Sequence, residues 1–286
     1  MAEPIGARHH TLQRLRRLSR RREARSADGA YVIDGPTLLA EALDAGVAVT
    51  EVVAEPDCPA ALFDRAALAG AAVHRASAGS LGRFVDTVTP QRVVAIARIA
   101  DVPPADAVAA AGPLALVLVG VSDPGNAGTL LRSAEAAGAG AVLFCDGSVD
   151  PFGPKCVRSS AGSLFRLAVT RAGDSGEVLA ALAARGVTTV ATAARGGETY
   201  DATDLTGPVA LVLGSEAHGL PAAVAAAVDR SVTIPMAGRT DSLNVGMAGT
   251  VLCFEALRQR RAGATGAQQG NRLDETPPRA AGCTTT

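Results

Sequence analysis

The chain has 286 residues, of which 48% are hydrophobic and only 3% aromatic, so two domains with cores of alanine, valine and leucine are expected. The formal net charge of −1 indicates no overall attraction to a polyanion. No apolar run reaches the ~18 residues of a membrane span, and no apolar stretch of a secretion signal stands at the N-terminus, so we expect a cytoplasmic protein without a membrane partner.

Arginine is concentrated near the N-terminus despite the balanced total. Residues 8–25 carry eight arginines against a single acid, Glu23. Leu12, Leu15 and Leu18 recur at helical spacing, which predicts one helix from Thr11 to about Ser26. Its arginines form either a solvated helix face or a surface for phosphate groups.

Alternating apolar runs and helical patterns follow, which predicts a first α/β domain over residues 1–105. Strands are expected at 31–33, 49–55, 71–77 and 92–99, and helices after Pro36 and over 58–70. Residues 101–113 are rich in proline and alanine, so we place an interdomain linker at 106–113.

A second α/β domain is predicted over residues 114–262. The continuous apolar runs that begin at Leu114 and Val209 are typical of parallel strands covered on both faces. Further strands are expected at 141–147, 164–171, 188–194 and 231–236, and helices at 127–137, 176–186, 220–229 and 242–261. Residues 263–286 are rich in glycine, glutamine, threonine and proline, which predicts a disordered tail.

Three polar loops follow buried strands of the second domain, where binding residues tend to lie. In the first, DPGNAGTLLRSAEAAG, Asn126 stands near a helix start and Arg132 lies six residues on. Asn126 as an N-cap, and Arg132 as a surface arginine paired with Glu135, are the alternatives to a functional role.

The second loop, LGSEAHGL, places two glycines around a polar turn, which permits close approach of a ligand to the backbone. A tight turn capped by Ser215 is the alternative. In the third, IPMAGRTDSLNVGMAG, Ser242 or Asp241 would serve as an N-cap. Asn244 then falls at an early helical position, where asparagine is unfavourable, and this conflict indicates function.

Other site types are not supported by the sequence. Gly138 and Gly140 lack the third glycine of a dinucleotide loop, and neither a phosphate-binding GxxxxGK[ST] nor a GxSxG motif is present. The cysteines and histidines show no metal-ligand spacing, so no metal is expected.

In these three loops the sequence resembles the SpoU/TrmH branch of the SPOUT methyltransferases. All three motifs occur in the family's order, and the resemblance covers about residues 114–261. Residues 11–100 resemble more loosely the family's small N-terminal substrate-binding domain, which is related to a ribosomal protein fold. Arg92 stands where relatives often have glycine after the TPQ sequence.

The resemblance implies a parallel sheet with a deep trefoil knot, whereas pattern alone predicts an unknotted doubly wound sheet. It also implies a homodimer with the active site at the subunit interface, and S-adenosylmethionine as the cofactor. The implied cofactor-binding residues are Leu213, Gly214, Ile234, Met236 and Leu243. The implied catalytic residues are Asn126, Arg132, Glu216, Ser242 and Asn244. Candidate RNA contacts are Arg14, Arg17, Arg21 and Arg158.

The implied reaction is methylation of a ribose 2′-hydroxyl in RNA. The family assigns the base to the residue matched by Arg132, but a guanidinium with a pKa above ~12 is a poor base, so binding of a phosphate and of the oxyanion is the other role. The N-terminal domain favours ribosomal RNA as substrate. Transfer RNA, a non-catalytic role in ribosome assembly and an antibiotic-resistance methylation are the alternatives.

Overall fold

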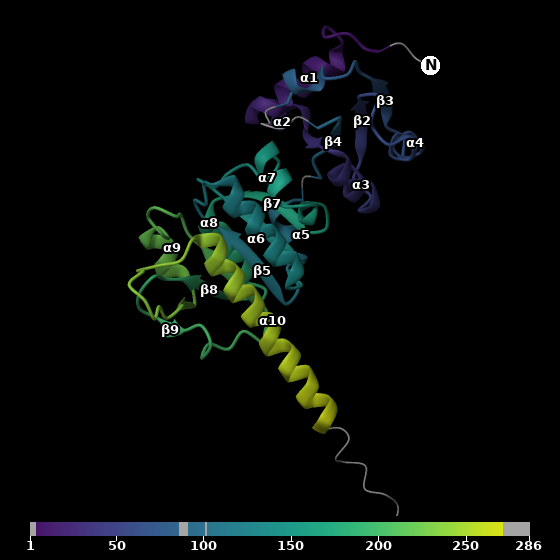
Figure 1. Ribbon diagram of the computed structural model, residues 1–286. Coiled ribbons are helices and arrows are strands. Elements are labelled where there is room, and N and C mark those ends of the chain that lie inside the picture. The colour runs from purple at the N-terminus through teal and green to yellow at the C-terminus, as the bar shows by residue number, and fades with distance from the viewer. Residues whose placement is uncertain (1–3, 86–90, 101, 271–286) are drawn as a thin grey trace, which may run out of the picture.

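The computed structural model describes residues 4–85, 91–100 and 102–270, and it contains two sheets at opposite ends of an elongated molecule (Figure 1). The smaller sheet has the strand order β1-β4-β2-β3. β4 pairs antiparallel with β1 and β2, whereas β2 and β3 are parallel. The elements of this N-terminal part are α1 (His10–Arg20), α2 (Arg22–Asp28), β1 (Ala30–Asp34), α3 (Pro36–Asp44), β2 (Val49–Ala54), α4 (Ala60–Leu68), β3 (Ala72–Arg75), η1 (Leu81–Arg83) and β4 (Val93–Arg98).

The predicted helix over residues 11–26 is wrong as a single element, because the chain is extended at Arg21 and divides it into α1 and α2. The leucines of α1 are buried as expected and pack against β1 and β4. After the break, Arg25 turns inward and its guanidinium binds the buried carboxylate of Asp150 at 2.7 Å. A single straight helix could not both pack its leucines against the small sheet and direct Arg25 to Asp150.

The larger sheet is wholly parallel, in the order β7-β6-β5-β10-β8-β11-β9, which confirms the predicted α/β class with a parallel sheet. Its elements are α5 (Pro104–Ala109), β5 (Leu114–Leu118), α6 (Pro124–Ala136), β6 (Ala141–Cys145), α7 (Pro154–Ser159), η2 (Ser163–Phe165), β7 (Ala168–Gly173), α8 (Ser175–Ala183), β8 (Thr188–Thr192), β9 (Glu198–Thr199), β10 (Val209–Leu213), α9 (Ala222–Ala227), β11 (Arg230–Thr233) and α10 (Val245–Gly270).

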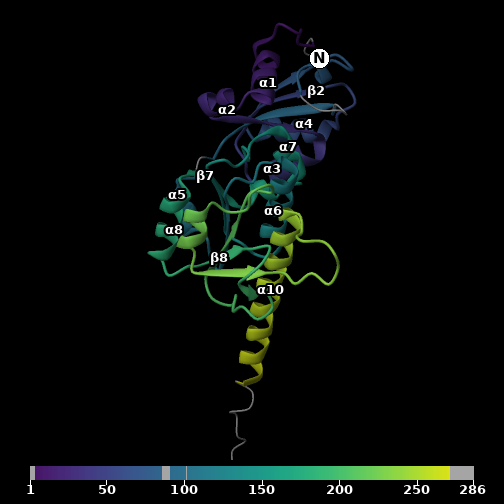
Figure 2. The same ribbon diagram turned by 90° about the vertical axis from the view of Figure 1, so that its left-hand side faces the viewer.

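Helices cover both faces of this sheet. Figure 2 shows α5 and α8 on one side and α6 and α10 on the other. The central strands β5, β6 and β10 are buried along their whole length, as their unbroken apolar sequences predict. The loops at their carboxyl ends are therefore held by a rigid, doubly covered layer.

Two segments differ from the expected organisation. Residues 104–109, placed partly in a linker, form α5, because Ala107 and Val108 are buried against the apolar face of the larger sheet. Residues 263–270, placed in a disordered tail, continue α10 instead. The rest of the predicted tail, 271–286, lies outside the described residues.

The described residues contain no helix with the length and apolar character needed to cross a membrane. Nor does this part of the chain bring together three side chains of the types that bind metals.

Candidate active site

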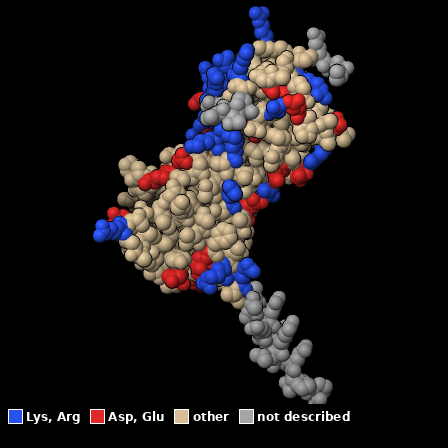
Figure 3. Space-filling view, in the orientation of Figure 1, with Lys and Arg blue, Asp and Glu red and all other residues tan. Residues whose placement is uncertain are grey.

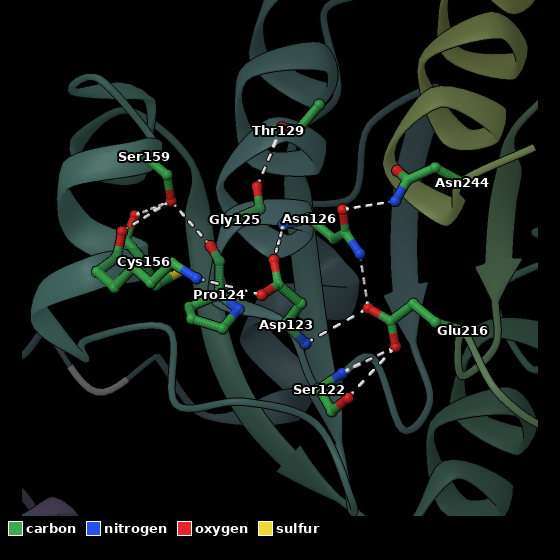
Figure 4. Close-up of polar contacts among 11 residues, drawn as sticks. Ser122, Asp123, Pro124, Gly125, Asn126, Thr129, Cys156, Ser159, Glu216 and Asn244 are labelled. Carbon is green, nitrogen blue, oxygen red and sulfur yellow. Dashed lines mark hydrogen bonds and ion pairs between the residues drawn. The ribbon is translucent and has the colours of Figure 1, made fainter.

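The three polar loops meet at the carboxyl ends of β5 and β10, joined by the side chain of Glu216. Its carboxylate accepts a hydrogen bond of 2.8 Å from Asn126 Nδ2 and bonds of 3.3 Å from the backbone N–H groups of Ser122 and Asp123 (Figure 4). Strands β5 and β10 are parallel neighbours in the sheet, which places these loops side by side. The loop after β10 is thus fastened to the loop after β5.

Asn126 extends this contact to the third loop. Its Oδ1 accepts a hydrogen bond of 3.0 Å from Asn244 Nδ2 (Figure 4). Asn244 Oδ1 in turn accepts one of 2.9 Å from the Gly246 N–H. A carboxylate only accepts, so Asn126 must turn its amide nitrogen to Glu216 and its oxygen to Asn244. One orientation of both amides satisfies the whole chain of contacts.

Both helix caps differ from the sequence-based alternatives. Asp123 caps α6, since its Oδ1 accepts from the Asn126 N–H at 2.9 Å and Pro124 occupies the first helical position. Asn244 itself precedes α10 and caps it, so neither Ser242 nor Asp241 is the cap. The unfavourable helical position inferred for Asn244 therefore does not exist, although the residue does lie in the site.

The charge of Glu216 is stabilised by its neighbours. Burial raises the pKa of this carboxyl, but the hydrogen bonds from Asn126 and from the backbone of Ser122 and Asp123 outweigh burial, and the pKa is lowered. Glu216 is consequently an ionised acceptor that holds donors, rather than a proton donor.

A cavity of about 440 Å³ lies beside this chain of contacts. Of the predicted cofactor-binding residues, Gly214, Ile234, Met236 and Leu243 line it, together with the predicted catalytic residues Glu216, Ser242 and Asn244. Leu213 does not line it and is fully buried beneath. The sequence analysis missed Thr192, Ala193, Ala194 and His218, which also line the cavity. The first three follow from the position of β8 beside β10, a strand order that local patterns do not reveal.

Gly214 is required by a close approach of the backbone. A Cβ atom there would lie 2.4 Å from the carbonyl carbon of Gly219, so any larger residue would open the turn. The turn lines the cavity with Gly214, Ser215 and Gly219, the last two of which hydrogen-bond to each other through their main chains. Ile234, Met236 and Leu243 add apolar surface. A nucleoside with a charged amino-acid end fits this combination, because main-chain groups can read a base edge while apolar side chains cover its faces.

Arg132 lies apart from the cavity. It is exposed on α6, does not line the cavity and pairs with no carboxylate in the described part of the chain. Glu135, its alternative partner, instead binds Arg166. The structure thus brings four of the five predicted catalytic residues together and leaves the arginine outside.

Two comparisons with known sequences agree with this geometry. Residues 113–254 match the SpoU rRNA Methylase family, and residues 10–95 match the MRM3-like substrate binding domain. A Bacillus subtilis 23S rRNA (guanosine(2553)-2′-O)-methyltransferase is 31% identical over 235 residues, which cover 82% of this chain and 90% of that protein. The chain belongs to the SpoU rRNA methylase family.

Solved structures of SpoU-type methyltransferases match nearly the whole fold. An AdoMet-bound rRNA methyltransferase from Sinorhizobium meliloti superposes with a TM-score of 0.80 at 30% identity, over 90% of this chain and 97% of that one. AviRb from Streptomyces viridochromogenes, in complex with AdoMet, also gives 0.80 at 30% identity, over 89% and 99%.

The arginines predicted to contact RNA in this SpoU family member lie in different surroundings. Arg14 is half-buried and binds Asp28 and Glu51 within its own domain. Arg17 and Arg21 are exposed, and Figure 3 shows that basic side chains gather over α1 and α2. Arg158 lies between the two parts of the molecule, 3.6 Å from the Asp34 carboxylate.

Proposed function

We propose that this protein uses S-adenosylmethionine to methylate a ribose 2′-hydroxyl in RNA, with ribosomal RNA as the favoured substrate, in the cytoplasm. The observation that carries the proposal is the chain Glu216–Asn126–Asn244 at the mouth of the cavity lined by Gly214, Ile234 and Met236. A relative matched over 82% of this chain and 90% of its own length is named as a 23S rRNA 2′-O-methyltransferase, and AdoMet-bound structures share the fold. The N-terminal substrate-binding domain favours ribosomal over transfer RNA.

In this proposal, one group of cavity residues binds the cofactor and another group holds the loops in position. S-adenosylmethionine, when bound, supplies an electrophilic methyl group. Main-chain groups at Gly214 and the apolar side chains of Ile234, Met236 and Leu243 hold and cover the nucleoside. Glu216, kept ionised, fixes Asn126, and Asn126 fixes the loop that carries Ser242 and Asn244. This preorganisation limits reorganisation during the reaction.

Arg132 acts on the RNA in this proposal. A guanidinium stays charged at neutral pH, so its role is to bind the phosphate next to the target ribose and to stabilise the oxyanion that develops. Removal of one such donor lowers turnover by about 10²–10³-fold. The Arg132→Ala variant is therefore expected to lose methyl transfer from tritiated S-adenosylmethionine to rRNA by about 100-fold or more, with cofactor affinity by calorimetry within about twofold of wild type.

Wild-type protein assayed on rRNA and tRNA separately decides the substrate class, and mapping of 2′-O-methyl groups in the labelled RNA locates the target. Transfer to tRNA alone would replace rRNA as the substrate. If the protein bound RNA in the absence of S-adenosylmethionine and transferred no methyl group when it was added, a non-catalytic role would be supported. If Arg132→Ala kept near wild-type turnover, Arg132 would neither bind the phosphate nor stabilise the oxyanion.

We also propose a homodimer that completes the site, and the trefoil knot of the family in the methyltransferase domain. Arg132 does not line the cavity of its own chain, which supports a second copy whose Arg132 reaches this cavity. Met247 and Phe254 on α10 are 61% and 46% exposed, and both are large apolar side chains seven residues apart on one helix. A second copy that covers this face would bury them.

A further inference from the structure

Helix α7 contacts the candidate active site through its last residue. Ser159 Oγ lies 2.8 Å from the carbonyl oxygen of Pro124, 2.8 Å from that of Lys155 and 3.1 Å from that of Cys156 (Figure 4). Its single hydrogen is shared among these acceptors, and the share given to Pro124 joins α7 to the first turn of α6. Lys155 Nζ adds a contact of 3.2 Å to Asp123, the residue that caps α6. Asn126 is only two residues beyond Pro124.

The two helices touch at the level of the backbone. A Cβ atom added to Gly128 of α6 would lie 1.9 Å from Ser159 Oγ and 2.7 Å from the Ser159 carbonyl carbon. Gly128 has no side chain that could adjust at this contact, and tightly packed interiors transmit the displacement of one helix to its neighbour. A shift of α7 would therefore move the first turn of α6.

The next side chain of α7 faces the substrate-binding domain. Arg158 Nη1 lies 3.6 Å from Oδ2 of Asp34, the last residue of β1. The Asp34 side chain is 2% exposed, and among the described residues neither carboxylate oxygen has a hydrogen-bond partner. Burial raises the pKa of Asp34, and the charge of Arg158 offsets only part of that effect.

An ion pair of this kind is poorly explained by stability. Buried polar groups are nearly always hydrogen-bonded, and a buried pair without good geometry gains little over apolar packing. Separation of the two charges would nevertheless leave a buried carboxylate uncompensated, so Asp34 holds Arg158, and with it α7, in place.

We propose that Ser159 is a positioning residue for methyl transfer. We further propose that the Asp34–Arg158 pair fixes the position of α7, and so of Ser159, relative to the substrate-binding domain. Ser159 acts through Pro124 on Asn126, whose hydrogen bonds to Glu216 and Asn244 lie at 2.8 and 3.0 Å. Displacement by a fraction of an ångström breaks such bonds, and misplacement of about 1 Å costs about 100-fold in rate. The inference rests on the proposed function.

A double-mutant cycle tests this relay. Ser159→Ala and Asp34→Asn are each expected to lower kcat at saturating rRNA about 10-fold, with the Kd of S-adenosylmethionine within about twofold of wild type. Because both act through α7, the double variant is expected to lose about 10-fold as well, whereas independent sites would multiply to about 100-fold. Ser175→Ala is the matched control, since that serine begins α8 and makes no side-chain hydrogen bond within the described residues.

A second variant displaces α7 at Ser159 itself while both the serine and Asp34 are kept. Gly128→Ala must push α7 from α6 and is expected to lower kcat at least as much as Ser159→Ala, while Gly207→Ala, with open space around its Cβ position, is the control. Multiplicative losses in the cycle, or full kcat in Gly128→Ala, would overturn the relay. A wild-type protein without methyl transfer to any RNA would overturn the proposed function instead, so the two failures are distinct.

Discussion

At the scale of single residues, the carboxylate of Glu216 accepts hydrogen bonds from four donors of the first loop, and Asn126 in turn accepts one from Asn244. An amide at position 216 would keep the shape of the side chain but would bring its own N–H₂ group toward those donors. The negative charge is thus the property that keeps the loops together.

Glu216→Gln is expected to lower kcat about 10- to 100-fold, because the loops that position Ser242 and Asn244 lose their common anchor. It is also expected to change the pH dependence of stability. The pKa of Glu216 is lowered in the folded protein, so its contribution is present above the ordinary pKa of 4.5 and is lost as pH falls through the folded value. Urea unfolding at neutral and acid pH measures this, and the wild type should lose its advantage over Glu216→Gln in acid. An advantage independent of pH would show that the charge is not the cause.

At the scale of elements, the helices α1 and α2 contain arginines of two kinds. Arg25 is buried against Asp150, and Arg14 is engaged by Asp28 and Glu51, whereas Arg20, Arg21 and Arg22 are exposed. Only exposed arginines are able to release counterions from an RNA backbone. The basic surface therefore runs from Arg16 and Arg17 of α1 to the start of α2. Its arginines at residues 20–22 pair with no acid among the residues that the structure describes, whereas Arg17 lies 3.4 Å from Asp28.

Replacement of Arg20, Arg21 and Arg22 by glutamine is expected to weaken rRNA binding and to reduce the slope of log affinity against log salt by about 2–3. S-adenosylmethionine binding should remain unchanged. Fluorescence anisotropy between 50 and 200 mM salt, roughly the range over which phosphate contacts dominate, measures the slope. Arg185→Gln, an exposed arginine that follows α8, is the control. An unchanged slope in the triple variant would show that RNA binds elsewhere.

The sequence predicted most strands because apolar runs are local patterns, and it located the three loops because they follow such runs. The strand expected over residues 164–171 is wrong at its start, where Leu164 and Phe165 belong to η2, and the short strand β9 was not predicted. The sequence did not distinguish Arg25 from its neighbours, since burial of Arg25 depends on Asp150, 125 residues away. Helix α5 was hidden for a similar reason: its Pro–Ala composition resembles a linker, and only the facing sheet makes Ala107 and Val108 a core. The caps of α6 and α10 were misassigned because several neighbouring residues could each serve as caps.

At the scale of the whole molecule, the two parts share an apolar core and buried ion pairs. The rings of Tyr31 and Phe152, one from each part, lie 5.3 Å apart. Arg25 and Asp150 have side chains only 7% and 5% exposed, and Arg166 joins Glu41 of α3 at 2.6 Å. Breaking a buried pair leaves an uncompensated charge, which favours one fixed arrangement of the parts. RNA held on α1 and α2 would then meet the cavity in a defined position. The proposed reaction further requires a guanidinium beside the methyl group of S-adenosylmethionine.

A second copy of the chain is expected to supply that guanidinium. Met247→Glu combined with Phe254→Ala should shift the protein from dimer to monomer in sedimentation equilibrium and abolish methyl transfer, because a charge cannot be buried at an apolar interface without large cost. Leu68→Glu is the control, since Leu68 is 89% exposed but lies on α4 in the other part of the molecule. A monomeric wild type, or an active monomeric variant, would contradict the dimer.

Mixed dimers separate assembly from catalysis. If Arg132 serves the cavity of the partner, a dimer of one Arg132→Ala chain and one Glu216→Gln chain contains one intact site, formed by Glu216 of the first chain and Arg132 of the second. Random mixing of two symmetric dimers makes half of the molecules mixed, so activity should return to about a quarter of wild type. If instead Arg132 served its own chain, both sites of every mixed dimer would carry a defect and no activity would return. Recovery therefore reports on the geometry of the reaction and not merely on the oligomeric state.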